Sequence, residues 1–155
     1  MSENRERCDV GLKKQQGIQS VKFEEPPIIC AAASVVGQKE GDGPFGDVFD
    51  QIESDPKVGG DTWEDAEGRL QERAIQKAGC GKEAIRYIVA GDLLGQLMAS
   101  SFGLAGFDKP LFGVYGACST MGESIGIGSM LVEGGFADYV LAMTSSHFAS
   151  AEKQF

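Results

Sequence analysis

Short apolar runs alternate with longer amphipathic stretches along most of this 155-residue chain. Four runs are apolar and bounded by turn residues, and they predict buried strands at 28–36, 85–90, 110–115 and 139–143. Three stretches space their apolar residues at helical intervals, and they predict helices at 61–79, 93–104 and 119–133. Strands that alternate with helices and are apolar on both faces predict an α/β fold with a mostly parallel mixed sheet covered by helices.

Local signals set the ends of the first long helix. Asp61 or Thr62 is a suitable N-cap, and Gly79 is a suitable stop. The apolar positions that predict its buried stripe are Ala66, Leu70, Ala74 and Ile75.

The chain before this helix is less regular. Residues 1–25 are polar and lack a steady period, so we expect a flexible leader followed by one domain over 26–155. Residues 37–46 hold four glycines and a proline and predict a loop. Residues 48–52 predict a short helix that ends before Asp55.

Acidic side chains are concentrated in one part of the chain, whose formal net charge is −9. Residues 38–72 carry three basic and eleven acidic side chains, whereas residues 1–25 are balanced. This pattern predicts a solvated acidic face. Because no basic stripe is present to hold a phosphate backbone, we expect no nucleic-acid partner.

Cysteine use and hydropathy limit the class of protein further. The four cysteines form no CxxC pair, so we expect neither a structural zinc site nor a disulfide framework. No apolar run approaches the length of a membrane span, and the N-terminus has no signal-peptide core. His147 is the single histidine and has no second ligand nearby in sequence, so no metal site is predicted.

The candidate chemistry centres on Cys118. This residue follows the predicted strand 110–115 and precedes the predicted helix 119–133, so it lies at a strand-to-helix elbow. The unpaired N–H groups and positive dipole end of a helix stabilise a thiolate and also bind small anions. Cys118 is therefore either a nucleophile or part of an anion pocket, and the alternative is a small buried core residue.

Other residues can join Cys118 in a site. Asp92 follows a buried strand, where it either contributes to a ligand pocket or caps the next helix. Gln96 lies one helical turn after Asp92 and would share its face. Ser119 and Thr120 offer N–H and hydroxyl donors beside Cys118, and His147 lies either at the pocket mouth or in an exposed loop. Gly122 and Gly126 are one turn apart and predict close helix packing.

Several motifs in this order resemble the stage V sporulation protein AD family. The stretches that carry the resemblance are 90–94 (Ala-Gly-Asp-Leu-Leu), 115–120 (Tyr-Gly-Ala-Cys-Ser-Thr), 132–137 (Val-Glu-Gly-Gly-Phe-Ala), 144–147 (Thr-Ser-Ser-His) and 151–155 (Ala-Glu-Lys-Gln-Phe). Lys39-Glu40 with residues 43–46, and Trp63-Glu64 with Ala66-Glu67, match the same pattern. The family pattern has an asparagine where this chain has Gly95.

The resemblance implies a thiolase-like fold, of which this chain would be one βαβαβαββ half, with the second half absent. It implies a protein of the spore-forming Firmicutes that binds dipicolinic acid, with calcium as part of the ligand complex, for its uptake into the developing spore. It also implies a homodimer at the spore inner membrane, peripheral to it on the cytosolic side, with partner proteins of the same apparatus. No separate cofactor is implied.

These implications favour a ligand-binding protein on an acyltransferase-type fold, with Asp92, Gln96, Cys118, Ser119, Thr120 and His147 as binding residues. The alternative is a thiolase-like or ketoacyl-synthase-like acyltransferase with Cys118 as its nucleophile. Acyl transfer requires a general base and an oxyanion hole beside the sulfur. In that superfamily the partner histidines come mainly from the second half.

Overall fold

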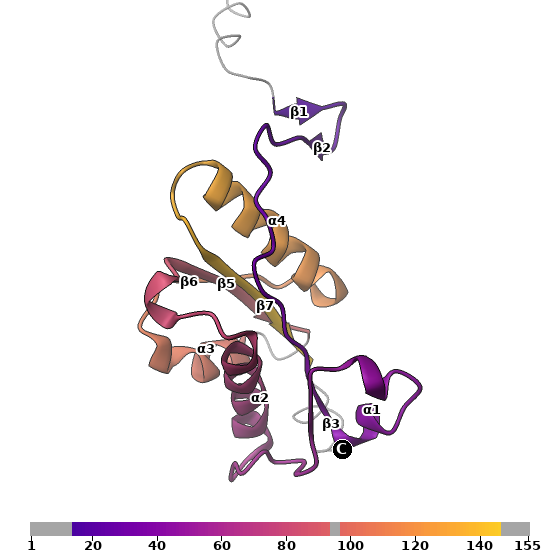
Figure 1. Ribbon diagram of the computed structural model, residues 1–155. Helices are drawn as coiled ribbons and strands as arrows, with labels where there is room; N and C mark the ends of the chain where they lie inside the picture. Colours follow the sequence, from indigo (N-terminus) through magenta and orange to yellow (C-terminus); the bar gives the residue numbers. More distant parts are fainter. Residues whose placement is uncertain (1–13, 94–96, 147–155) are drawn as a thin grey trace, which may run out of the picture.

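The computed structural model describes residues 14–93 and 97–146, in which strands and helices alternate (Figure 1). The strands are β1 (Gln15–Gln16), β2 (Ser20–Val21), β3 (Val35–Gly37), β4 (Gln51–Glu53), β5 (Tyr87–Asp92), β6 (Leu111–Gly113) and β7 (Val140–Ser145). The helices are α1 (Gln38–Gly41), α2 (Trp63–Ala78), α3 (Met98–Gly103) and α4 (Thr120–Glu133). Short 3-10 turns are η2 (Gly46–Val48), η3 (Lys82–Ala84), η4 (Ala105–Phe107) and η5 (Ala117–Ser119).

The main sheet has the order β6-β5-β7, and all of its strands are parallel. Helix α4 covers one face of this sheet, and α2 and α3 lie on the other (Figure 1). The buried core lies between the sheet and α2 and α3, and consists of Ile75, Ile85, Ile88, Ala90, Leu104 and Met143. Parallel strands covered by helices confirm the predicted α/β class.

Helix α2 has the ends that its sequence predicts. The hydroxyl of Thr62 accepts a hydrogen bond from the Asp65 N–H at 3.1 Å, which is the expected N-cap contact. Gly79 ends the helix with a φ of 70°, a left-handed conformation that favours glycine. Of its predicted stripe, Ala66 and Ile75 are buried, whereas Leu70 and Ala74 are half-buried. Two polar side chains that the apolar pattern did not predict, Glu67 and Gln71, are buried as well.

Close helix packing occurs at a different glycine pair from the predicted one. A Cβ atom on Gly103 of α3 would lie 2.6 Å from the Cα of Gly68 on α2, so these two backbones touch. At Gly122 and Gly126 an added Cβ atom would meet nothing within 4 Å among the described residues. The prediction of close packing at these positions is therefore wrong for this part of the chain.

The predicted first strand, 28–36, is mostly wrong. Only its last residues belong to a strand, β3, which pairs in parallel with β4. Upstream, Ile28 and Ile29 are 81% and 76% exposed and pair with no strand. The predicted helix at 48–52 is also wrong beyond η2, since Ile52 lies in β4 and pairs with Val36. An apolar run forms a strand only where another strand can pair with it, and that second strand can lie far away in the sequence.

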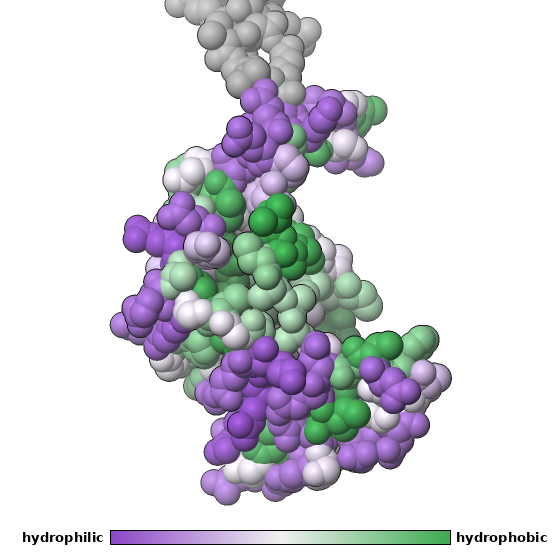
Figure 2. Space-filling model, in the orientation of Figure 1, coloured by the Kyte–Doolittle hydropathy of each residue, from purple (hydrophilic) through white to green (hydrophobic). Residues whose placement is uncertain are grey.

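Helix α4 buries small residues and exposes apolar ones. Thr120, Ser124 and Gly128 are buried at intervals of four residues, and Gly128 faces Val140 of β7. Met121 and Ile125 are exposed. Figure 2 shows apolar surface across the middle of its view, between the hydrophilic hairpin at one end and a hydrophilic region at the other.

The N-terminal hairpin β1-β2 lies at one end of the molecule (Figure 1). An ion pair of 2.8 Å between Lys14 Nζ and Glu133 Oε1 links it to the last turn of α4. The hairpin lies within the predicted leader, of which residues 1–13 are outside the described part. In residues 14–93 and 97–146, no helix combines the length and the apolar character that a membrane span requires.

Candidate functional site

The candidate site is the carboxyl edge of the main sheet. Because β5, β6 and β7 are parallel, their carboxyl ends meet at one edge, where open α/β sheets bind ligands. The Val114 N–H donates to the Ala90 carbonyl at 2.9 Å, and the Thr144 hydroxyl donates to the Gly91 carbonyl at 3.1 Å. The first bond holds the segment that leads to Cys118 beside the end of the central strand, and the second holds β7 there.

Gly91 permits this close approach. A Cβ atom at position 91 would collide with the carbonyl oxygen of Val114 and would lie 2.8 Å from the Thr120 methyl group. Any larger residue would push the elbow away from β5. This role of Gly91 could not be predicted from its sequence neighbours, because the contact joins segments more than twenty residues apart.

Asp92 is fully buried at the end of β5, and both oxygens of its carboxylate accept hydrogen bonds. Oδ2 accepts from the Ala99 N–H at 3.0 Å, and Oδ1 accepts from the Ser100 N–H at 3.0 Å. The hydroxyl of Ser100 donates to Oδ1, and that of Ser145 lies 3.2 Å from it. Asp92 thus has the helix-capping geometry that was one of its two alternatives, and its role in ligand binding stays a prediction.

The hydrogen-bond network extends from Asp92 into α2. Gln71 Nε2 donates to the Ser100 hydroxyl oxygen at 3.1 Å, deep between α2 and α3. Gln71 Oε1 is buried and has no hydrogen-bond partner among the described residues. This buried network fixes the position of α3 relative to the strand end. Gln96, predicted to share the face of Asp92, lies outside the described residues.

Cys118 lies in η5, directly before α4, and it is exposed. The predicted strand-to-helix elbow is therefore confirmed, and the alternative of a buried core residue is wrong. Ala117, the residue before it, has a φ of 50°, in the left-handed region that is unusual for alanine. The N-terminus of α4 has no side-chain cap. The exposed sulfur therefore lies next to a helix end whose first N–H groups carry the positive end of the dipole.

The two hydroxyl residues after Cys118 differ in their surroundings. Thr120 is fully buried, and its hydroxyl oxygen accepts from the Gly116 N–H at 3.2 Å, so it holds the elbow turn closed. Ser119 is exposed, and its hydroxyl lies 2.7 Å from the Gly116 carbonyl and also within hydrogen-bonding reach of the Glu123 carboxylate. Its single proton can be donated to one of these acceptors at a time.

Glu123 is the site residue that the sequence analysis missed. Its carboxylate contacts the Ser119 hydroxyl, and a Cβ atom on Gly116 would collide with it. Glu123 therefore lies over the elbow turn, in the first turn of α4. The four-residue spacing from Ser119 on a predicted helix was a signal that could have identified it.

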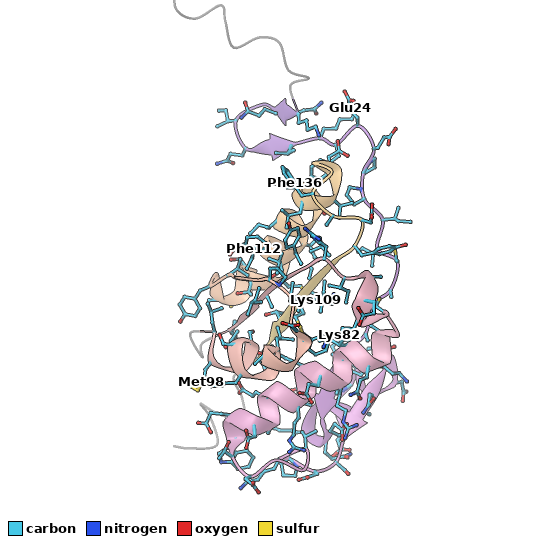
Figure 3. All side chains as sticks on the ribbon, turned by 90° about the vertical axis from the view of Figure 1, so that its left-hand side faces the viewer. Glu24, Lys82, Met98, Lys109, Phe112 and Phe136 are labelled. Carbon is cyan, nitrogen blue, oxygen red and sulfur yellow. The ribbon has the colours of Figure 1, made fainter. Side chains whose placement is uncertain are left out.

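No other described part of the chain gathers the predicted residues. His147 lies outside the described residues, and no group of three or more metal-ligating side chains occurs in the described ranges. A shallow hollow of about 640 Å³ lies at the opposite, amino edge of the sheet, and is lined in part by Arg86, Lys109 and Phe136. Lys109 and Phe136 are labelled in Figure 3. None of the predicted site residues lines this hollow.

Comparison with known proteins agrees with the motifs around this edge. Residues 17–155 match the family described as stage V sporulation protein AD. Stage V sporulation protein AD of Bacillus subtilis (strain 168) is 40% identical over 146 residues, which cover 92% of this chain. The match covers 43% of that relative, so the chain spans less than half of its length. The α/β arrangement is consistent with the thiolase-like half-fold that the resemblance implies.

Proposed function

Because the chain belongs to the stage V sporulation protein AD family, we propose that it takes part in binding dipicolinic acid, with calcium, for uptake into the developing spore. Dipicolinic acid is a flat pyridine with two carboxylates. A pocket for such a ligand needs N–H and O–H donors for the carboxylate oxygens, and a bound calcium ion would neutralise much of the charge.

The observation that carries this proposal is the exposed Cys118 in η5, the 3-10 turn that leads directly into α4. The first N–H groups of a helix lack intrahelical acceptors, and they are directed toward whatever lies before the helix. Here η5 runs directly into α4, and the Ser119 and Thr120 N–H groups already donate to the Gly116 and Ala117 carbonyls, so a ligand carboxylate would accept from the N–H groups of Ala117 and Cys118 before them. Cys118 and Ser119 then form the wall of the pocket, while Asp92 and Thr120 support it from beneath.

Calorimetric titration of the full-length protein with calcium dipicolinate tests this proposal. We expect binding heat in the wild type and a weaker affinity in Cys118→Phe, because a large side chain at the exposed elbow would obstruct the ligand. Cys80→Phe is the matched control, since Cys80 is also exposed but lies after α2, away from the elbow. Absence of heat at millimolar ligand would contradict the proposal.

The second candidate function is acyl transfer with Cys118 as nucleophile. The left-handed backbone of Ala117 favours it, because strained strand-to-helix turns are used to expose nucleophiles. Incubation with an acyl-CoA followed by mass spectrometry distinguishes the two functions. A covalent adduct that is absent in Cys118→Ser would establish the acyltransferase, and its absence in the wild type favours binding.

The remaining expectations concern the setting of the protein. We propose that it works as a homodimer, on the cytosolic side of the spore inner membrane, with membrane proteins of the same uptake apparatus. Copurification from sporulating cells with membrane fractions tests the location. Recovery of the protein away from those fractions would contradict it.

A further inference from the structure

Three connecting segments at the amino edge of the main sheet line the shallow hollow of about 640 Å³. One leads from η3 into β5, one leads into β6 and contains Lys109, and one leads from α4 into β7 and contains Phe136. Figure 3 labels these two side chains. The hollow lies at the opposite end of the strands from Cys118, so a molecule bound here would leave the elbow free. Its volume is in the range of small-molecule sites.

Two cationic side chains line this hollow, and neither forms an ion pair with a carboxylate in the part of the chain that the structure describes. They are Arg86 and Lys109. The Arg86 guanidinium lies 5.6 Å from the centre of the Tyr87 ring, and this contact restricts its orientation. Lys109 is half-buried. Because water solvates a half-buried ammonium group incompletely, a bound anion would stabilise it.

The same hollow offers aromatic surface to a ligand. Phe136 is 67% exposed, and its ring lies so close to Gly134 that a Cβ atom there would be 2.8 Å from it. The half-buried Tyr87 ring packs edge-on against Phe112, with ring centres 5.5 Å apart. Both rings are therefore held in place by the protein. A ligand that joins a carboxylate to an aromatic ring could use the cations and the rings together.

Two acidic side chains, Glu83 and Asp138, also line the hollow. Both are exposed, so water screens their charges strongly. They weaken the attraction for an anion without cancelling that of the half-buried Lys109. They disfavour a ligand with several negative charges, which would be repelled from both, and a single carboxylate therefore fits this hollow best.

We propose that the hollow at the amino edge is a separate binding site for a small aromatic monocarboxylate. Lys109 and Arg86 pair with its carboxylate, and Phe136 and Tyr87 contact its ring. This site does not depend on the function proposed for the carboxyl edge, because the two edges share none of these residues.

Saturation-transfer NMR on the full-length protein tests the proposal with three probes. Sodium benzoate has the ring and the carboxylate, sodium acetate lacks the ring, and benzylamine has the ring with the opposite charge. We compare the wild type with Lys109→Gln and Ala84→Trp. Ala84 is exposed and lines the hollow, so a tryptophan there would fill it. Lys77→Gln is the matched control, since it removes an equal charge from an exposed position on α2 that does not line the hollow.

We expect saturable benzoate binding in the wild type, about tenfold or more tighter than that of acetate or benzylamine. Lys109→Gln and Ala84→Trp should each weaken benzoate binding about tenfold, and Lys77→Gln should leave it unchanged. Circular dichroism checks that each variant is folded. Absence of saturable benzoate binding would overturn the proposal, and so would tighter binding of benzylamine or an unchanged benzoate affinity in either folded variant of the hollow.

Discussion

Asp92 shows how far a residue's role depends on atoms that are remote in sequence. An aspartate after a buried strand suits both a ligand pocket and a helix cap. Its hydrogen-bond donors come from Ala99 and Ser100 on the next helix and from Ser145 on another strand. The sequence suggested a cap on the next helix but gave no sign of these particular donors, and Ser145 reaches Asp92 only because β7 pairs with β5.

Asp92→Asn should lower the free energy of unfolding by about 2 kcal/mol, because an amide NH₂ would face buried N–H donors and leave one unsatisfied. Denaturant unfolding measures this change. Asp108→Asn is the matched control: Asp108 is exposed with a φ of 52°, a conformation that asparagine tolerates, so its stability should stay near the wild-type value. Equal stability of the two variants would show that the buried network contributes little.

Ser119 and Thr120 show what the elbow motif alone could not reveal. As neighbours with similar hydroxyls, both were predicted to offer donors to a ligand. One residue of helix rotation separates them by about 100°, which leaves Ser119 exposed and buries Thr120 against Gly91. The motif predicted the elbow before α4 correctly, but which of its hydroxyl residues is exposed and which is buried depends on packing.

At the scale of elements, the signals that act within a few residues predicted a helix correctly. Apolar runs did not predict which segments pair as strands. Helix α2 was predicted from an N-cap and a C-terminal glycine, both of which act within a few residues. The strand 28–36 was predicted from apolar residues alone, and most of it found no partner strand. Strand β4, with the sequence Gln-Ile-Glu, has a single apolar residue, and only its pairing with β3 makes it a strand.

The β3-β4 pair should weaken in acid because of one carboxylate. The Ser34 N–H donates to Asp50 Oδ2 at 2.7 Å, and the Ser34 hydroxyl donates to the same atom at 2.9 Å. These two bonds, the backbone bond more than the hydroxyl bond, hold the pKa of Asp50 below its ordinary value of 3.8. Since the folded-state pKa is lowered, the stabilisation is present above the unfolded pKa and is lost as pH falls through the folded value.

Hydrogen exchange of the amides in β3 and β4, measured for the wild type and Asp50→Asn, checks this pH dependence. The wild type should exchange more slowly near neutral pH, and the difference should disappear in acid. In Ser34→Ala the difference should shrink without vanishing, because the backbone N–H of residue 34 still donates. A difference that persists unchanged into strong acid would contradict this account.

At the scale of the whole molecule, α4 differs from an ordinary surface helix, which buries its apolar residues and exposes its polar ones. Its small residues pack on the sheet, and Met121 and Ile125 are exposed on the outside. Phe112 of the edge strand β6 and Tyr115 after it are exposed as well. Exposed apolar residues in this number mark a surface that another chain or segment covers.

We expect a second copy of the protein to cover this surface. Ile125→Glu should therefore lower the dimer affinity about tenfold or more. A symmetric interface would then bury one unpaired carboxylate from each of the two copies. Sedimentation of the full-length protein over a range of concentrations measures the association. Phe102→Glu is the control: Phe102 is 79% exposed on α3, across the sheet from α4, so its replacement should leave the dimer intact. If Ile125→Glu lowers the stability but leaves the dimer unchanged, then a further segment of the same chain covers α4, and the dimer forms elsewhere.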